Sequence, residues 1–156
     1  MANFKSMRPL VGVPAPFLYA LAFLVGLALD RFVPWHPAWL HAFRPLGWML
    51  VVIGVLISPL SAALLGWKRT TLNPLGKPSH LVVSGWYKIT RNPMYLGLAI
   101  AYVGLCVAMG RLWPVFILAA PLVFLDRVVV PFEEQQLQAT FGRDFSRYCG
   151  RVRRWL

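Results

Sequence analysis

The chain has 156 residues, of which 58% are hydrophobic and only 13% are charged, with 16 Lys and Arg against 5 Asp and Glu. A soluble globular protein is about 45–50% apolar and about 25% charged, so the composition excludes an ordinary soluble domain and indicates an integral membrane protein. The net charge of +11 comes from basic residues that bracket apolar runs, which argues against nucleic-acid binding and for contact with anionic lipid head groups.

Two long apolar runs occupy residues 1–67. The first extends from Leu10 to Leu29, closed by Asp30, and the second from Leu46 to Trp67. Each reaches the length of about 20 residues that a helix needs to cross the hydrocarbon. The first run is too long for a removed signal peptide, so it is interpreted as a retained span. Three prolines within these runs predict kinks: Pro14, Pro16 and Pro59.

A polar loop over residues 68–93 leads into a predicted helical hairpin over residues 94–130. The two short apolar runs of this hairpin meet at a tight turn formed by Gly110 and Arg111. We expect Arg111 to snorkel toward the membrane surface at the tip of the hairpin. The second helix of the hairpin extends to Val130 if Asp126 and Arg127, which interrupt its apolar run, lie at the far interface of the membrane.

The distribution of basic residues predicts the orientation. Thirteen of the 16 Lys and Arg residues lie in the N-terminus, the 68–93 loop and the tail that starts at Arg127, and three lie on the other side. The positive-inside rule therefore predicts that both termini face the cytoplasm, most naturally across a cytoplasmic (inner) membrane.

The tail, residues 131–156, is polar enough to leave the bilayer as cytosolic helices. Pro131 is expected to begin the first of them, with Glu133 and Glu134 near its positive end, and Gly142 to end it. The next segment has an apolar and a basic face and is expected to lie on the membrane surface. The apolar face comprises Phe145, Tyr148, Val152 and Trp155, and the basic face Arg147, Arg151 and Arg154.

The densest polar cluster of the loop and the only two glutamates flank the same hairpin on the predicted cytoplasmic side. The cluster is GWYKITRNPMYLG, residues 85–97, and the glutamates are Glu133 and Glu134. Each has a structural explanation when read alone, because Pro93 suits the first turn of a helix and carboxylates suit a helix N-terminus. Because the cluster and the glutamates lie on the same predicted side of the membrane, together they instead predict one polar pocket with a wall open to lipid.

Several kinds of site are absent from the sequence. It has no glycine-rich dinucleotide or P-loop motif, and no Ser-His-Asp or H-E-x-x-H arrangement. Cys106, Cys149 and the three histidines lack the spacing of metal ligands, so no metal is predicted.

Two segments resemble the integral-membrane methyltransferases grouped with isoprenylcysteine carboxyl methyltransferase and phospholipid N-methyltransferase. They are HLVVSGWYKITRNPMYLG (80–97) and EEQQLQATFGRDFSRYCGRVRRW (133–155), while the two N-terminal spans match only in being hydrophobic. The resemblance implies one all-α integral membrane domain over residues 1–156, with about four transmembrane helices and a cytosolic helical tail that closes the cofactor site. It also implies methyl transfer from S-adenosylmethionine to a lipophilic acceptor.

The resemblance carries roles to individual positions. The implied cofactor-binding residues are Ser79, His80, Leu81, Val82, Tyr87, Asn92, Pro93, Met94, Tyr95 and Glu133. Tyr95 and Glu134 are candidate catalytic bases, with water as the alternative, and Arg91 and Arg127 are candidate acceptor-binding residues. Family members often have histidine where this chain has Asn92, whose amide can hydrogen-bond but cannot titrate.

The acceptor stays open at this point among a phospholipid amine, a small thiol and an isoprenoid. The isoprenylcysteine branch carries an arginine one turn before the glutamate, where this chain has Val129. An isoprenylcysteine carboxyl O-methyltransferase is therefore an alternative, as are an NADPH-using membrane reductase and a non-catalytic membrane scaffold. The sequence does not reveal the oligomeric state.

Overall fold

The computed structural model describes residues 11–70, 75–76 and 78–156. The beginning of the first predicted span at Leu10, and the basic residues Lys5, Arg8 and Lys77, lie outside the described residues. Within them every regular element is helical, and three helical stretches are long and apolar enough to cross a membrane, with one shorter apolar helix. The long stretches are Ala15–Phe32, Ala38–Trp67 and Trp113–Phe141, and the shorter helix is Pro93–Met109. The prediction of an all-α integral membrane protein is confirmed.

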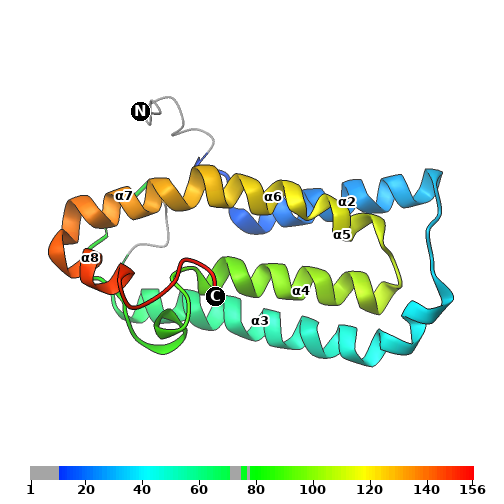
Figure 1. The fold of residues 1–156 in the computed structure, drawn as a ribbon, viewed down its shortest axis with the longest axis horizontal. Coiled ribbons are helices and arrows are strands. Elements are labelled where there is room, and N and C mark those ends of the chain that lie inside the picture. Colours follow the sequence, from blue (N-terminus) through cyan, green and yellow to red (C-terminus); the bar gives the residue numbers. More distant parts are fainter. Residues whose placement is uncertain (1–10, 71–74, 77) are drawn as a thin grey trace.

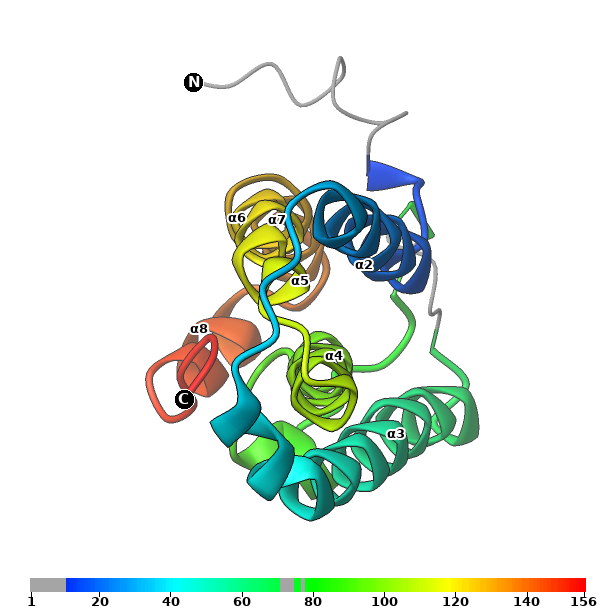
Figure 2. The same ribbon diagram turned by 90° about the vertical axis from the view of Figure 1, so that its right-hand side faces the viewer.

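The helical stretches run antiparallel along one long axis, and α4 lies at the centre of the bundle (Figures 1 and 2). The N-terminal part comprises α2 (Ala15–Phe32), η1 (Ala38–Phe43) and α3 (Arg44–Trp67). The remaining elements are η2 (Gly85–Lys88), α4 (Pro93–Met109), α5 (Trp113–Ile117), α6 (Ala119–Phe124), η3 (Leu125–Val129), α7 (Val130–Phe141) and α8 (Arg143–Cys149). The described parts of the 68–92 loop, the end of α7 and α8 therefore lie at one end of the bundle (Figure 1).

The second arm of the hairpin is longer than the sequence predicts. The turn itself is as expected, because Gly110 ends α4 in the left-handed region at a φ of 68°. Beyond it, α5, α6, the π-helical turn η3 and α7 succeed one another without a loop as far as Phe141. The helix continues through Asp126 and Arg127, where Asp126 accepts hydrogen bonds from Arg154 and Trp155. The position of these two residues relative to the membrane stays a prediction.

Two other local expectations also change in the structure. Pro14 and Pro16 stand before and within the first turn of α2, where a proline interrupts no helical hydrogen bond. Of the three prolines expected to kink the first two spans, only Pro59 lies in a helix interior. The apolar face of the tail is turned toward the protein and not toward lipid: Phe145, Tyr148 and Val152 are buried. Partly buried side chains pack against this cluster from the loop, α7 and the tail: Leu81, Leu137, Phe141 and Cys149.

Small residues bring α3 and α4 into backbone contact. A Cβ atom added to Gly54 would lie 2.4 Å from the carbonyl oxygen of Gly97 and 2.4 Å from the backbone nitrogen of Ala101. Gly97 in turn faces the backbone nitrogen of Ser58, at 2.8 Å from its own added Cβ. Such contacts are typical of membrane helices, whose association depends on close van der Waals packing more than on the hydrophobic effect. These close contacts with α3 fix the position of α4 in the bundle.

We predict that Gly54→Ala destabilises the protein, because the new methyl group has no space beside the backbone of α4. The expected loss is about 1–3 kcal/mol of unfolding free energy, measured by thermal unfolding in detergent. Gly66→Ala is the matched control in the same helix, since no heavy atom lies within 4 Å of its added Cβ. Equal stability of the two variants would show that the helices do not pack this closely.

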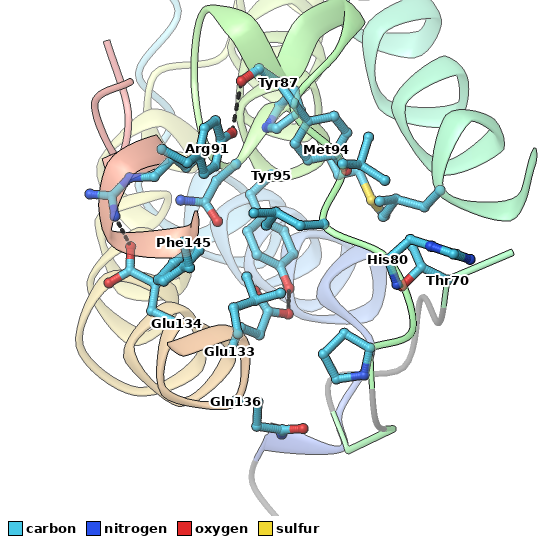
Figure 3. Close-up of a pocket in the computed structure, with 18 of the residues that line it drawn as sticks. Thr70, His80, Tyr87, Arg91, Met94, Tyr95, Glu133, Glu134, Gln136 and Phe145 are labelled. Carbon is cyan, nitrogen blue, oxygen red and sulfur yellow. Dashed lines mark hydrogen bonds and ion pairs between the residues drawn. The ribbon is translucent and has the colours of Figure 1, made fainter. Parts of the chain in front are cut away.

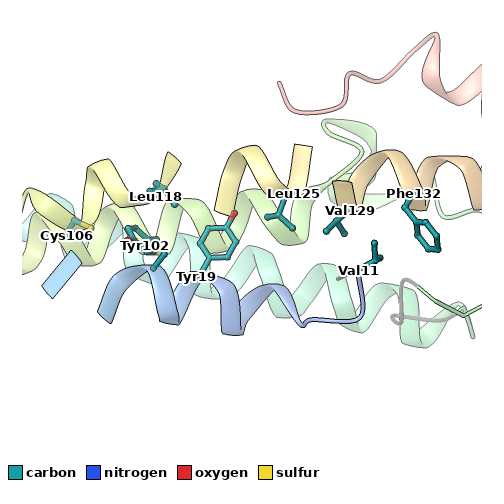
Figure 4. Close-up of a cluster of buried hydrophobic side chains, with 9 residues drawn as sticks. Val11, Tyr19, Tyr102, Cys106, Leu118, Leu125, Val129 and Phe132 are labelled. Carbon is teal, nitrogen blue, oxygen red and sulfur yellow. The ribbon is translucent and has the colours of Figure 1, made fainter. Parts of the chain in front are cut away.

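The buried core joins α2, α4 and the Trp113–Phe141 stretch (Figure 4). Its buried members are Val11, Tyr19, Ala22, Tyr102, Cys106, Leu118, Leu125, Val129 and Phe132. Two phenol groups satisfy backbone carbonyls within it: Tyr102 donates to Pro114 O at 2.7 Å, and Tyr19 donates to Tyr95 O at 3.1 Å. The core therefore fixes α4 and α7 relative to each other along the bundle.

An ion pair closes the opposite end of the bundle. Arg111 pairs with the carboxylate of Asp30, whose side chain has no exposed surface. His36 contacts the same carboxylate through Nε2 at 2.6 Å. Arg111 thus binds a buried carboxylate of α2 while 36% of its side-chain surface stays exposed. The expectation that it reaches toward the membrane surface stays a prediction.

Candidate functional site

A hollow lies where the described part of the 68–92 loop, the start of α4, the first half of α7 and α8 come together (Figure 3). It encloses about 950 Å³ when its open mouth is counted. Nine of the ten residues expected to bind a cofactor line it: His80, Leu81, Val82, Tyr87, Asn92, Pro93, Met94, Tyr95 and Glu133. Segments from both sides of the hairpin thus contribute to one cavity, as the sequence predicts.

Tyr95 and Glu133 face each other inside this hollow (Figure 3). The Tyr95 hydroxyl donates a hydrogen bond of 2.6 Å to Glu133 Oε1, which joins the first turn of α4 to α7. Within residues 11–70, 75–76 and 78–156, no ion pair joins Glu133 to a cation. The site therefore contains a partly buried carboxylate that is oriented by a phenol and whose charge is not balanced by a described side chain.

Glu134 has a different environment although it is the next residue. It forms ion pairs with Arg91 Nη1 at 2.9 Å and with Arg154 Nη2 at 2.7 Å. Arg91 also donates through Nη1 to the sulfur of Cys149 at 2.8 Å. Since two guanidinium groups hold Glu134, its charge is compensated, and the side chain joins the loop and the C-terminus to α7.

Tyr87 and Tyr148 form the wall of the hollow between η2 and α8. The Tyr148 hydroxyl donates a hydrogen bond of 2.7 Å to the carbonyl of Tyr87. Burial raises the pKa of Tyr148 to about 12. Burial also raises the pKa of Tyr87, and the nearby Glu133 carboxylate raises it further. Both phenols are therefore neutral at physiological pH and present aromatic surface and hydroxyl groups without charge.

Asn92 contributes to the hollow and to its support. Its side-chain Nδ2 donates to the carbonyl of Arg154 at 2.9 Å, and the Thr90 hydroxyl donates to the same oxygen at 3.1 Å. One amide hydrogen of Asn92 is therefore committed to the C-terminal segment. Only the remaining polar atoms of its side chain are available to a ligand.

Two predicted site residues lie elsewhere. The Ser79 hydroxyl donates to the carbonyl of Arg69 at 2.6 Å, and Ser79 is not part of the lining. Arg127 is 80% exposed at its side chain, contacts Asp126 at 3.5 Å, and also lies outside the lining. The structure therefore does not bring Arg127 to the hollow, whereas Arg91 lines it.

Other lining residues were not assigned to the site by the sequence. They are Leu65, Thr70, Gly76, Pro78, Gln136, Leu137, Phe145 and Tyr148. A helical spacing of three and four residues from Glu133 could have identified Gln136 and Leu137. Leu65 lies in the last turn of α3 and Thr70 just after that helix, and no local pattern indicates that this end turns toward the hollow.

The comparison with protein families agrees with these observations. The model of the phospholipid methyltransferase family matches residues 43–144, which include α3, α4, the loop between them and α7 with both glutamates. No curated protein and no solved structure matches the chain. The match covers more than half of the chain and takes in the lining residues of the loop, α4 and α7, whereas Phe145 and Tyr148 of α8 lie just beyond it. The chain therefore belongs to the phospholipid methyltransferase family of membrane methyltransferases.

Proposed function

We propose that the protein transfers a methyl group from S-adenosylmethionine to a lipophilic acceptor at the cytoplasmic face of the membrane, with both termini in the cytoplasm. The observation that carries this proposal is the Glu133 carboxylate, which Tyr95 orients within the hollow and which has no cationic partner among the described residues. A partly buried anion favours binding of a cation, because burying a charge is costly unless it is paired.

The lining fits the proposed cofactor in chemistry. S-adenosylmethionine carries a sulfonium and an ammonium group, and when bound it supplies an electrophilic methyl group. Glu133 would hold a cationic part of it, while Tyr87, Met94 and Phe145 offer aromatic and apolar surface to the remainder. Leu81 and Val82 add further apolar wall from the loop.

The contribution of the chain to the reaction is then binding, orientation and exclusion of water. Methyl transfer is an in-line displacement, so placing the acceptor close behind the methyl carbon is the main requirement. A site with little water also favours attack on a cationic donor, whose charge is dispersed as the reaction proceeds. The apolar walls of the hollow support both effects.

The hydrogen bonds argue for positioning roles at the two candidate bases. The Tyr95 hydroxyl donates a hydrogen bond to Glu133, and the charge of Glu134 is compensated by Arg91 and Arg154. Both carboxylate oxygens of Glu134 are engaged by guanidinium groups, so this side chain is occupied in joining the loop and the C-terminal segment to α7. We therefore assign Tyr95 and Glu134 to orienting the site, and an acceptor that arrives deprotonated, or loses its proton to water, needs no further base.

The charges of the hollow favour an amine, thiol or isoprenoid acceptor over a carboxylate. An isoprenylcysteine carboxylate needs a cation to hold it, but Arg91 is engaged by Glu134, and Arg127 points elsewhere. The NADPH-using reductase is disfavoured for a related reason, since the Glu133 carboxylate, which has no cationic partner among the described residues, would oppose the phosphates of a dinucleotide. A non-catalytic scaffold could use the Tyr95–Glu133 hydrogen bond to join α4 to α7, but it would not require that carboxylate to face a hollow.

The test is transfer of label from methyl-labelled S-adenosylmethionine into a lipid extract by the purified full-length protein in detergent. We expect labelled product in the organic phase, in amounts that grow with enzyme and time and are suppressed by S-adenosylhomocysteine. Cofactor binding without any labelled lipid would contradict the proposed acceptor class. Absence of both binding and transfer would contradict the methyltransferase itself.

A further inference from the structure

The last residues of the chain form what we call the C-terminal strap, residues 151–156, which crosses between two walls of the hollow. Its backbone holds the loop that precedes α4. The carbonyl of Arg154 accepts hydrogen bonds from Asn92 Nδ2 at 2.9 Å and from the Thr90 hydroxyl at 3.1 Å. The carbonyl of Arg153 accepts one from the backbone N–H of Arg91 at 3.0 Å. Three consecutive loop residues are therefore fixed by two consecutive carbonyls of the strap.

The side chains of the strap hold the opposite wall. Arg154 binds both carboxylate oxygens of Glu134, through Nη2 at 2.7 Å and Nε at 3.2 Å. Its Nη1 also reaches Asp126 Oδ1 at 3.4 Å, and Trp155 Nε1 donates to the same oxygen at 2.9 Å. A bidentate contact between a guanidinium and a carboxylate fixes direction as well as distance. One residue, Arg154, thus binds the loop with its backbone and α7 with its side chain.

The points of attachment lie next to the residues that face the proposed cofactor. Pro93, Met94 and Tyr95 come directly after Asn92, and Glu133 directly precedes Glu134. Neighbouring residues of a helix point in directions about 100° apart, so a fixed Glu134 side chain fixes the rotation of α7 and hence the direction of Glu133.

The rotation of α7 also depends on the π-helical turn η3, which directly precedes it. A π turn inserts an additional residue into the helical repeat and changes which side the subsequent residues face. The strap binds Asp126 within this turn and Glu134 beyond it, so Arg154 contacts the helix on both sides of the change. The strap is therefore placed to keep α7 in the rotation that brings Glu133 to Tyr95.

We propose that Arg154 is a positioning residue, which acts through Glu134 and the Asn92 loop to hold Glu133 and Tyr95 in the geometry that binds the cofactor. This inference rests on the proposed methyltransferase function, and it adds a requirement for the C-terminal strap that the cofactor-facing residues alone do not imply.

The experiment compares Arg154→Gln, Arg154→Lys and the control Arg151→Gln in the full-length protein in detergent. Arg151 lies in the same strap, carries the same charge and is exposed. We expect Arg154→Gln to raise the Kd for S-adenosylmethionine by about 10-fold or more, because it loses a charge-assisted bidentate contact. Arg154→Lys keeps the charge and loses the bidentate geometry, so its Kd for S-adenosylmethionine should rise by only about threefold. Arg151→Gln should bind as the unsubstituted protein does.

A role in positioning is distinguished from a role in overall stability by coupling. If Arg154 acts through Glu134, then Glu134→Gln raises the Kd by a similar factor, and the combined variant is no weaker than the worse single variant. The KM for S-adenosylmethionine should rise more than kcat falls, while the helical circular dichroism of the variants stays unchanged. If Arg154→Gln does not fold, the Arg154→Lys variant alone decides.

Unchanged cofactor affinity in either folded Arg154 variant would overturn the inference, as would fully additive effects of the two substitutions. These outcomes differ from failure of the proposed function, in which the unsubstituted protein itself does not bind S-adenosylmethionine.

Discussion

Glu133→Gln is expected to weaken S-adenosylmethionine binding by about 100-fold, which corresponds to ~2.7 kcal/mol. The substitution keeps the shape of the side chain and an oxygen that can accept from Tyr95, but it removes the negative charge that the hollow offers to a cationic ligand. The Kd is measured by equilibrium dialysis with labelled cofactor in detergent, and the fold is checked by circular dichroism.

Asp144→Asn is the matched control for this substitution. It makes the same kind of chemical change at a carboxylate that is 75% exposed at the start of α8, where its ionic partner is Arg147. We expect the control to bind the cofactor normally. A Glu133→Gln variant that is folded and binds as tightly as the control would remove Glu133 from the site.

The largest expected effect on stability comes from Arg111→Gln at the other end of the bundle. The Asp30 side chain has no exposed surface, so removing its guanidinium partner leaves a buried carboxylate whose remaining hydrogen-bond partners among the described residues are His36 and the backbone N–H of Trp35. Breaking one half of a buried ion pair costs about 3–5 kcal/mol, and thermal unfolding in detergent should show a corresponding loss.

Arg44→Gln, an exposed arginine at the start of α3 on the same end of the bundle, should have little effect. The double variant Asp30→Asn with Arg111→Gln should recover part of the stability, because the buried charge is gone. The fraction of the Arg111→Gln variant that remains folded should keep its cofactor affinity, because the Asp30–Arg111 pair lies at the opposite end of the bundle from the hollow. If Arg111→Gln is as stable as the control, the buried pair does not hold α2 to the hairpin.

The pairing of the loop with the tail could be predicted from the sequence because it is a consequence of topology. A hairpin returns the chain to the side from which it entered, so Tyr95 at its beginning and Glu133 beyond its end lie at the same membrane face. The structure places the Tyr95 hydroxyl 2.6 Å from Glu133 Oε1. The loop residues around Tyr87 lie at that end of the bundle for the same reason, and they line the same hollow.

The individual partners of charged residues could not be predicted in this way. Asp30 has the position of an ordinary span end in the sequence, and only the three-dimensional structure shows that the turn after α4 brings Arg111 to it. Glu134 and Arg154 are separated by twenty residues, and their contact depends on the reversal at Gly142 and α8. Periodicity identifies the face of a helix, but it does not identify which of several arginines will reach that face.

The apolar face of the tail illustrates a second limit. Phe145 and Tyr148 have the spacing of a helix that lies on a membrane, and the same spacing suits a helix that packs onto protein. In the structure these residues cover the hollow together with Leu81 and Leu137. Hydrophobic periodicity predicts that a face is buried, whereas the partner that buries it is decided by the rest of the fold.

A structure of the protein with S-adenosylhomocysteine bound would test most directly whether the loop and the tail enclose one cofactor site. We expect the ligand to lie in the hollow, with its amino group toward Glu133 and with contacts to residues on both sides of the hairpin. A ligand bound on the outer side of the bundle, touching neither Tyr95 nor Glu133, would contradict it.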